Sequence, residues 1–142
     1  TGKDSDQKDG MDLTLIIYDQ KINQVQFAGA NNPIFYFQQG ELNEIKGDRM
    51  PIGVYGEFEQ SFTRTEFNVQ QGDRIYLFTD GYVDQFGGNQ FKKFKFNRFR
   101  KLFKDIQDQD FEKQKATLNE TLKNWRGKFE QIDDILIMGI GF

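Results

Sequence analysis

Apolar and polar residues alternate through the first half of the chain, with the two-residue period of a β-strand that buries one face. In residues 11–18, MDLTLIIY, the side chains of Leu13, Leu15 and Ile17 share one face. Val25 and Phe27 alternate with glutamines in a second strand, and the turn DQKINQ makes the two a hairpin. Turn-forming residues and a glycine-bearing loop at 46–56 separate further expected strands at 34–37, 42–46, 61–67 and 74–79.

The period changes to that of amphipathic helices after residue 90. One predicted helix has an i, i+3, i+4, i+7 apolar stripe, formed by Phe99, Leu102, Phe103 and Ile106. A second is centred on 112–123, with a stripe formed by Phe111, Leu118, Leu122, Trp125 and Phe129. The last segment, DDILIMGIGF, is again typical of a strand. Strands, two helices and a final strand predict an α+β fold with mainly antiparallel sheet.

Length and charge limit the kinds of partner. The 142 residues fit one domain, which we expect at 11–142, preceded by a mobile polar lead-in at 1–10. The net charge of −3 gives no overall attraction to nucleic acid or to an anionic membrane. The sequence has neither an apolar stretch of the roughly 20 residues that a membrane span needs nor a signal-peptide pattern. We therefore expect a cytoplasmic segment that binds neither membrane nor nucleic acid.

The chain contains no cysteine and no histidine. Disulfides, thiol nucleophiles, Ser-His-Asp chemistry and almost every zinc site are thereby excluded. Carboxylates, lysine, hydroxyl groups and a hard metal ion held by oxygen ligands remain available for catalysis.

Acidic residues occur at the ends of two strongly apolar strands. Asp80 follows the strand at 74–79, and Asp133 and Asp134 precede the final strand. If these strands are antiparallel neighbours, the acids converge at one sheet edge, where a cation such as Mg²⁺ or Mn²⁺ would relieve their repulsion. Gly81 permits a sharp turn and leaves room near the metal. The alternative is that Asp-Gly and Asp-Asp are ordinary turns or caps.

Five motifs then carry a family resemblance. GDRIYLFTDGYVDQF (72–86) and QIDDILIMGIGF (131–142) resemble the last two motifs of the metal-dependent PPM, or PP2C-type, serine/threonine phosphatases, in the bacterial branch that includes SpoIIE and RsbU. Three further segments match in the same order: DGMDLTLIIYD (9–19), FAGANNPIFYF (27–37) and GDRMPIG (47–53).

The resemblance implies part of an αββα sandwich with two Mn²⁺ or Mg²⁺ ions between its sheets and a metal-activated water that hydrolyses phosphoserine or phosphothreonine. By motif, Asp80 and Asp133 are metal ligands. Asp134 is expected beside the metal site rather than on the metal, although which of Asp133 and Asp134 binds directly stays open. Asp84 is a weaker candidate. The resemblance assigns backbone-shaping roles to Gly29, Gly53 and Gly81.

The sequence departs from the family in lacking its first metal motif, GD-x-S/T-G-H-G. We therefore expect the C-terminal portion of a phosphatase domain, with ligands for one ion at most and little activity by itself. A smaller departure is Asn31, where relatives often have histidine.

The resemblance also implies partners. These are a phosphorylated regulatory protein of the anti-sigma-factor-antagonist type and N-terminal sensor domains in the parent chain. A dimer through exposed sheet edges is also compatible with a partial domain. The alternative function is a non-catalytic interaction module that has kept the fold.

A basic aromatic run, FKKFKFNRFRKLFK (91–104), contains seven Lys or Arg and no acid. Such runs hold single-stranded nucleic acid in many proteins. Phe99 and Phe103 belong to the predicted apolar stripe, however, which favours a solvated basic face. A docking surface for a phosphoprotein or a regulatory domain is the second interpretation, and nucleic acid the third. Trp125 is expected in the core, and Thr79 is expected to be structural.

Overall fold

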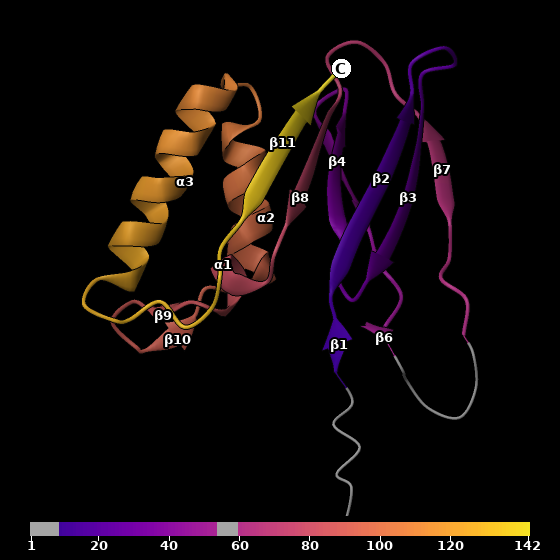
Figure 1. Ribbon diagram of the computed structural model, residues 1–142. Helices are drawn as coiled ribbons and strands as arrows, with labels where there is room; N and C mark the ends of the chain where they lie inside the picture. Colours follow the sequence, from indigo (N-terminus) through magenta and orange to yellow (C-terminus); the bar gives the residue numbers. More distant parts are fainter. Residues whose placement is uncertain (1–8, 54–59) are drawn as a thin grey trace, which may run out of the picture.

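In the computed structural model, which describes residues 9–53 and 60–142, two antiparallel sheets stack face to face and helices cover one of them (Figure 1). The four-stranded sheet has the order β11 (Ile137–Gly141), β8 (Arg74–Phe78), β4 (Ile34–Gln38), β5 (Glu41–Ile45). The three-stranded sheet has the order β2 (Leu13–Asp19), β3 (Gln24–Ala30), β7 (Thr65–Asn68). The α+β prediction with mainly antiparallel sheet is confirmed.

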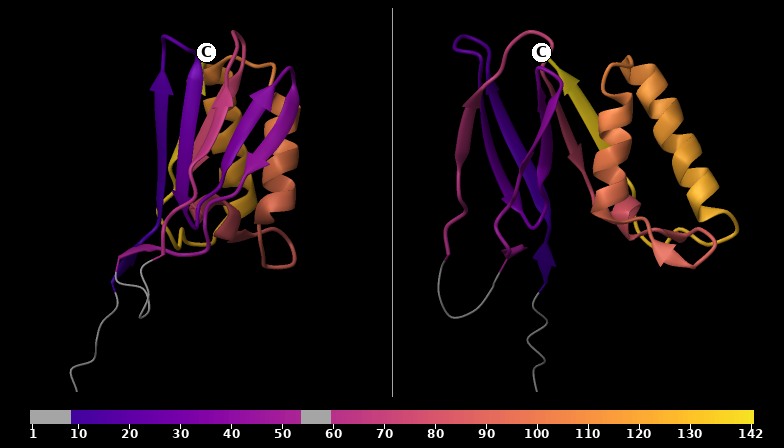
Figure 2. Two further views of the ribbon diagram at one scale, coloured as in Figure 1. Left: turned by 90° about the vertical axis from the view of Figure 1, so that its right-hand side faces the viewer. Right: turned by 180° about the vertical axis from the view of Figure 1, so that it is seen from behind.

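Three helices and two short strand pairs complete the described fold. The helices are α1 (Gly81–Asp84), α2 (Lys95–Ile106) and α3 (Phe111–Arg126). The short pairs are β1 (Gly10–Met11) with β6 (Ile52–Gly53) and β9 (Phe86–Gly87) with β10 (Lys92–Lys93). Both views in Figure 2 place α2 and α3 on the side of the four-stranded sheet that faces away from β2, β3 and β7.

The central strand β4 shows why the layers form. Its first four residues, Ile34–Phe37, are all buried, and their side chains alternate between the two faces of the sheet. Phe35 and Phe37 pack toward the helices, whereas Ile34 and Tyr36 pack toward the three-stranded sheet. β8 alternates in the same way. The four-stranded sheet is therefore shared by two apolar cores.

The helix-side core is largely aromatic. Phe99 and Phe103 of α2 are fully buried against Phe35 of β4, with ring centroids 5.6 and 5.5 Å from it. Trp125 of α3 packs at the edge of the same core, 5.4 Å from Phe94, as the sequence predicted. α3 begins at Asp110, whose side chain accepts a hydrogen bond from the backbone N–H of Lys113.

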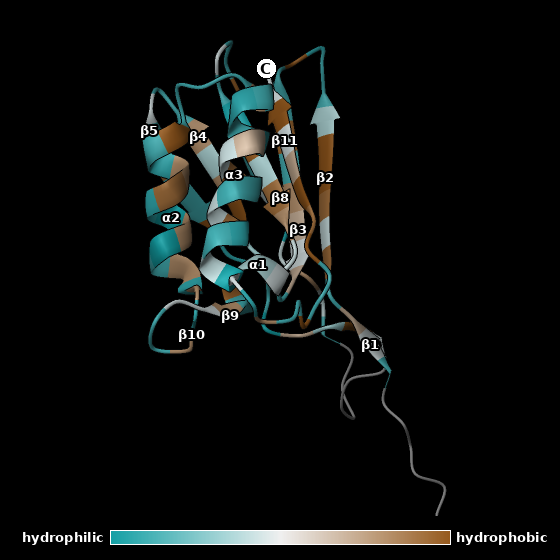
Figure 3. Cartoon of the chain, turned by 90° about the vertical axis from the view of Figure 1, so that its left-hand side faces the viewer, coloured by the Kyte–Doolittle hydropathy of each residue, from teal (hydrophilic) through white to brown (hydrophobic). Residues whose placement is uncertain are grey.

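Several local expectations differ from the structure. The predicted strand at 61–67 is formed only from Thr65 onward. The one-turn helix α1 and the β9–β10 pair lack a long periodic pattern and were not predicted. On β2, Ile16 packs into the core, whereas Leu15 and Ile17 are about half exposed, at 50% and 55%. The face of this strand that carries Leu15 and Ile17 therefore points away from the other sheet. Figure 3 shows that most of β2 is apolar.

The ends of the sheets and of the chain bear on three predictions. The predicted lead-in lies largely in residues 1–8, outside the described part, and Gly10 pairs with Gly53. β2 and β11 are terminal strands of their sheets, and the dimer through such edges stays a prediction. Among the described residues, no helix has the length and apolar character needed to cross a membrane.

Candidate metal centre

The pairing of β8 with β11 brings the two acidic strand ends together. The strands are antiparallel, with Phe78 opposite Ile137. Beyond the last paired residues, Thr79 continues the connection: its backbone N–H donates to the Leu136 carbonyl at 3.0 Å and its hydroxyl donates to the Asp134 carbonyl at 2.8 Å. The same hydroxyl accepts from the Leu136 N–H at 3.0 Å. Thr79 is therefore structural, and the convergence expected from sequence is present.

Asp80 lies among other carboxylates. Although the residue as a whole is exposed, partial burial of its carboxyl group is the largest cause of a raised pKa. The charges of Asp84 and then of Asp133 raise the pKa further, and Asp133 also interacts with Asp80 through a side-chain hydrogen bond. Negative charge on Asp80 is thus unfavourable unless a cation is nearby.

Asp133 and Asp134 have different surroundings. The Asp133 side chain is the one that reaches Asp80, and its Oδ1 also accepts from the Asp134 N–H at 2.7 Å. Asp134 contributes its backbone carbonyl to Thr79. Asp133 is therefore the member of the pair whose side chain lies beside Asp80, whereas Asp134 contacts Thr79 through its backbone.

Gly81 is required by a close approach of two chain segments. A Cβ atom at this position would collide with the backbone carbonyl oxygen of Asp134 and would lie 2.9 Å from Ile135 Cγ1. The residue therefore lets the segment that carries Asp133 lie directly on the start of α1. Gly29 meets a similar constraint, since a Cβ there would collide with the carbonyl oxygen of Asn32, and Gly53 has a positive φ of 140°.

Asp84 at the end of α1 already has a partner. Its Oδ1 lies 3.0 Å from Nζ of Lys93 in β10. The weaker candidate from sequence is therefore next to Asp80 and forms a partly exposed ion pair with a lysine of the following strand pair.

The sequence did not identify Gln85, a residue that connects the segments around the candidate metal centre by hydrogen bonds. Its side chain is fully buried, and Nε2 donates to the Glu130 carbonyl at 2.8 Å. The backbone carbonyl of Gln85 accepts hydrogen bonds from Trp125 Nε1 at 2.9 Å and from the Phe94 N–H at 3.0 Å. Gln85 thereby joins α1 and α3 to the loop that leads to Asp133. No local motif identifies a buried amide of this kind.

Asp12 is a second residue that the sequence did not single out. Its Oδ1 accepts from Nδ2 of Asn31 at 2.8 Å. Asp12 and Thr79 line the same groove of about 240 Å³ between β2 and β11. The amide of Asn31, where relatives often have histidine, thus keeps a hydrogen bond at this edge of the sandwich.

The carboxylates form a partial site. In the ranges 9–53 and 60–142, no three Asp, Glu, His or Cys side chains come together in an arrangement able to hold a metal ion. Asp80 and Asp133 nevertheless provide two oxygen donors near each other, and Mg²⁺ is commonly held by one or two carboxylates together with waters and substrate phosphate. The donor set therefore fits one hard divalent cation incompletely.

Stacked antiparallel sheets, flanking helices and acids at the ends of adjacent strands define the class of PP2C-type phosphatase domains. The model of the family Stage II sporulation protein E (SpoIIE) matches residues 2–142. The chain belongs to the SpoIIE family.

Solved structures have a similar fold. The SiaA-PP2C domain of Pseudomonas aeruginosa is 32% identical and superposes with a TM-score of 0.82, over 92% of this chain and 51% of that one. The Mn-presoaked SpoIIE phosphatase domain of Bacillus subtilis is 18% identical, with a TM-score of 0.66, over 92% and 56%. The catalytic domain of the serine/threonine phosphatase PstP, in complex with two manganese ions, is 17% identical, with a TM-score of 0.59, over 92% and 57%.

The chain thus spans about half the length of these similar structures. A comparison with curated protein sequences found no match.

Proposed function

We propose that this chain forms part of a metal-dependent protein phosphatase that hydrolyses phosphoserine or phosphothreonine on a regulatory protein. The observation that carries the proposal is the meeting of Asp80 and Asp133 across the β8–β11 pair in a SpoIIE-family fold. The manganese ions in the similar PstP structure support the choice of Mn²⁺ or Mg²⁺.

The residues of the chain have separate roles in this proposal. Asp80 and Asp133 provide oxygen ligands, and Gly81, Thr79 and Gln85 fix the two backbone segments that carry them. A divalent cation bound there supplies Lewis-acid activation of water and stabilises charge on the phosphate. Because the residues in 9–53 and 60–142 form no group of three metal-ligating side chains, and Asp84 is paired with Lys93, we expect these 142 residues alone to bind Mn²⁺ weakly and to turn over slowly.

Calorimetric titration with Mn²⁺ tests the metal role. We expect weak binding to the wild-type chain, lost in Asp80→Asn and in Asp133→Asn, because each substitution removes one of two charged ligands. Asp108→Asn is the matched control, since Asp108 is an exposed acid in the α2–α3 turn. Hydrolysis of a phosphoserine peptide with and without Mn²⁺ provides the second readout.

A titration in which Asp80→Asn, Asp133→Asn and Asp108→Asn all match the wild type would count against the metal site. Asp80 would then be a turn residue, and the non-catalytic interaction module would be the better account of this chain.

A further inference from the structure

We propose that the β9–β10 hairpin and the loop after α3 form a docking surface for an acidic, phosphorylated segment of the partner protein. The surface consists of an aromatic platform, Phe86, Phe91 and Phe129, and of the lysines that follow Phe91 or precede Phe129 in the chain: Lys92, Lys93, Lys95 and Lys128. Nζ of Lys93 lies 6.0 Å from the centre of the Phe86 ring. This inference rests on the proposed function, because it assigns the surface to the phosphoprotein that the carboxylate site would act on.

The rings of the aromatic platform contact one another and remain exposed to solvent. Phe86 and Phe91 stack with centroids 5.1 Å apart, and Phe91 contacts Phe129 at 4.5 Å. Phe91 remains 56% exposed and Phe129 39% exposed. Large apolar side chains that are held in place but left in contact with water are typical of interaction surfaces.

The hairpin is held rigidly against α3. The Gly88 N–H donates to the Trp125 carbonyl at 2.9 Å, and a Cβ at Gly87 would collide with the same carbonyl. Phe91, the first residue of the run 91–104, and Lys95, the first residue of α2, have positive φ angles of 50° and 70°. Bulky residues rarely adopt this conformation, and such local strain is concentrated at functional sites.

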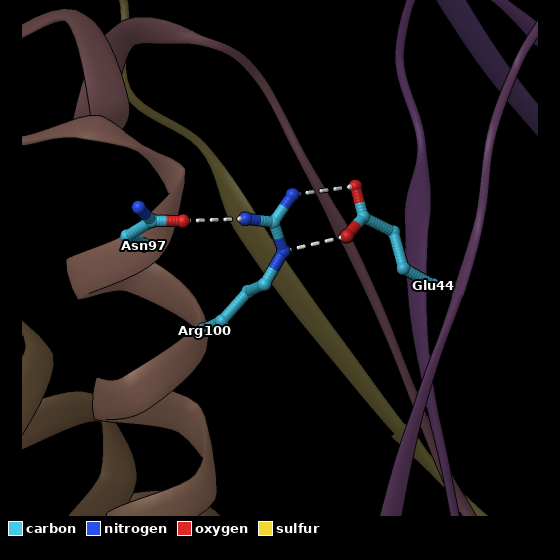
Figure 4. Close-up of polar contacts among 3 residues, drawn as sticks. All are labelled: Glu44, Asn97 and Arg100. Carbon is cyan, nitrogen blue, oxygen red and sulfur yellow. Dashed lines mark hydrogen bonds and ion pairs between the residues drawn. The ribbon is translucent and has the colours of Figure 1, made fainter.

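The basic residues of 91–104 divide into two groups. Three residues of α2, Arg98, Arg100 and Lys101, have partners: Arg100 makes an ion pair with Glu44 of β5 through two hydrogen bonds, 2.6 and 3.2 Å long (Figure 4). Lys101 pairs with Asp105 at 2.6 Å, and the Arg98 guanidinium lies 4.7 Å from the Trp125 ring centre. The solvated basic face predicted from the sequence is confirmed for Arg98, Lys101 and Lys104, which are exposed. Arg98, Arg100 and Lys101 nevertheless already have partners within the chain.

Three of the four lysines assigned to the surface have no ion-pair partner among the described residues. Within residues 9–53 and 60–142, no carboxylate lies within ion-pair distance of Lys92, Lys95 or Lys128. Lys93 links this group to the metal centre, because the acid it pairs with, Asp84, is the neighbour of Asp80. Figure 3 shows β9 and β10 at the same end of the molecule as α1.

Charge complementarity indicates which kind of segment would bind to this surface. The candidate metal centre carries several acids, and the whole chain has a net charge of −3, so a dianionic phosphate approaches an unfavourable field. The local lysines offset that field beside the site, while the exposed phenylalanines accept apolar side chains of the same segment. An acidic phosphopeptide with one or two apolar residues matches both features.

Binding of fluorescent peptides to the full 142-residue chain tests the proposal. The probe is a phosphoserine peptide with flanking Asp, Glu and Leu residues, and a second peptide has Gln in place of the flanking acids. We expect Lys92→Glu combined with Lys128→Glu to weaken binding of the acidic peptide about tenfold, since two ion pairs become repulsions. Lys104→Glu with Lys115→Glu changes the charge equally at exposed sites away from the platform and should leave affinity within about twofold.

Other outcomes overturn the proposal. Equal losses in the two double variants would show only a non-specific effect of net charge, and an undetectable affinity of the wild type for the acidic peptide would leave no docking surface. Tighter, Lys92-dependent binding of a single-stranded oligonucleotide at the same ionic strength would assign the platform to nucleic acid instead.

The peptide assay is repeated with Mn²⁺ and with Asp80→Asn to separate the two proposals. Binding that needs the lysines but ignores both metal and Asp80 would support the docking surface and count against the metal site. Binding that responds to Mn²⁺ and Asp80 but not to the lysines would support the proposed function alone.

Discussion

At the residue scale, Asp80 has the least favourable electrostatic position that we find at the candidate metal centre. Partial burial and two neighbouring acids oppose its ionisation, whereas Asp84 has a lysine partner. Residues whose ionisation is opposed in this way are common at functional sites, because ligand binding can relieve the unfavourable charge.

Asp80→Asn is therefore expected to stabilise the metal-free chain at neutral pH. The folded-state pKa of Asp80 is raised above its value in the unfolded chain, so folding is favoured while the group is protonated and loses that contribution as pH rises through the folded-state pKa. The melting temperature of Asp80→Asn should exceed that of wild type at pH 7, and the difference should vanish below the ordinary aspartate pKa of about 3.9.

Calorimetric melting across this pH range, without added metal, measures the effect. Asp108→Asn is again the control and should show no comparable pH-dependent gain. A lower melting temperature of Asp80→Asn at pH 7 would contradict the unfavourable placement of the carboxylate.

Gly81→Ala should destabilise the fold by about 2–3 kcal/mol, because the new methyl group must displace the Asp134 carbonyl or α1. Urea denaturation gives the free energy of unfolding. Gly72→Ala is a useful comparison: Gly72 has a φ of 92° but nothing within 4 Å of its Cβ position, so only backbone strain of about 1–2 kcal/mol applies. If the two variants lost the same stability, the close approach at Gly81 would be unimportant.

At the scale of elements, α2 is joined to the four-stranded sheet by both apolar and ionic contacts. Phe99 and Phe103 fill the interface, and the Arg100–Glu44 pair closes its edge with side chains that are 33% and 19% exposed. Asn97 accepts a further hydrogen bond from Arg100 at 3.1 Å and helps to orient the guanidinium (Figure 4).

Arg100→Lys should cost about 1 kcal/mol, because an ammonium group cannot form two parallel hydrogen bonds to Glu44. Lys101→Met removes the exposed Lys101–Asp105 pair on the same helix and should cost only about 0.3–0.5 kcal/mol. Urea denaturation of both variants gives the free energy of unfolding. A smaller loss of that free energy for Arg100→Lys than for Lys101→Met would be evidence against a stabilising Arg100–Glu44 pair.

At the scale of the molecule, the four-stranded sheet links two cores. Its strands present Phe35 and Tyr76 to the helices and Ile34 and Ile75 to the other sheet. A change in one core therefore acts on strands that also support the other core.

Phe103→Ala should cost about 3–5 kcal/mol, as expected for removal of a fully buried ring. Because the cores share strands, we also expect unfolding of the variant to remain a single transition. Far-ultraviolet circular dichroism and fluorescence of Trp125, followed against urea, should have the same midpoint. Separate midpoints would show that the helical layer unfolds independently of the three-stranded sheet.

The sequence by itself determined the order and type of most elements. The two-residue period in IFYF and the 3.6-residue period around Phe99 and Phe103 predict local structure because side-chain direction repeats with the backbone. The absence of cysteine and histidine restricted the chemistry to oxygen ligands, and the order of five motifs gave the SpoIIE family, which the family comparison confirmed.

Only the tertiary structure decided which of these residues lie together. Strand pairing places the side chain of Asp133, rather than that of Asp134, beside Asp80. It also brings the Asp134 carbonyl so close to residue 81 that only glycine fits there. It also separated the paired arginines of α2 from the lysines around Phe91, which are indistinguishable in the run 91–104. These facts depend on contacts between residues 45 to 56 positions apart, and local periodicity carries no information about such contacts.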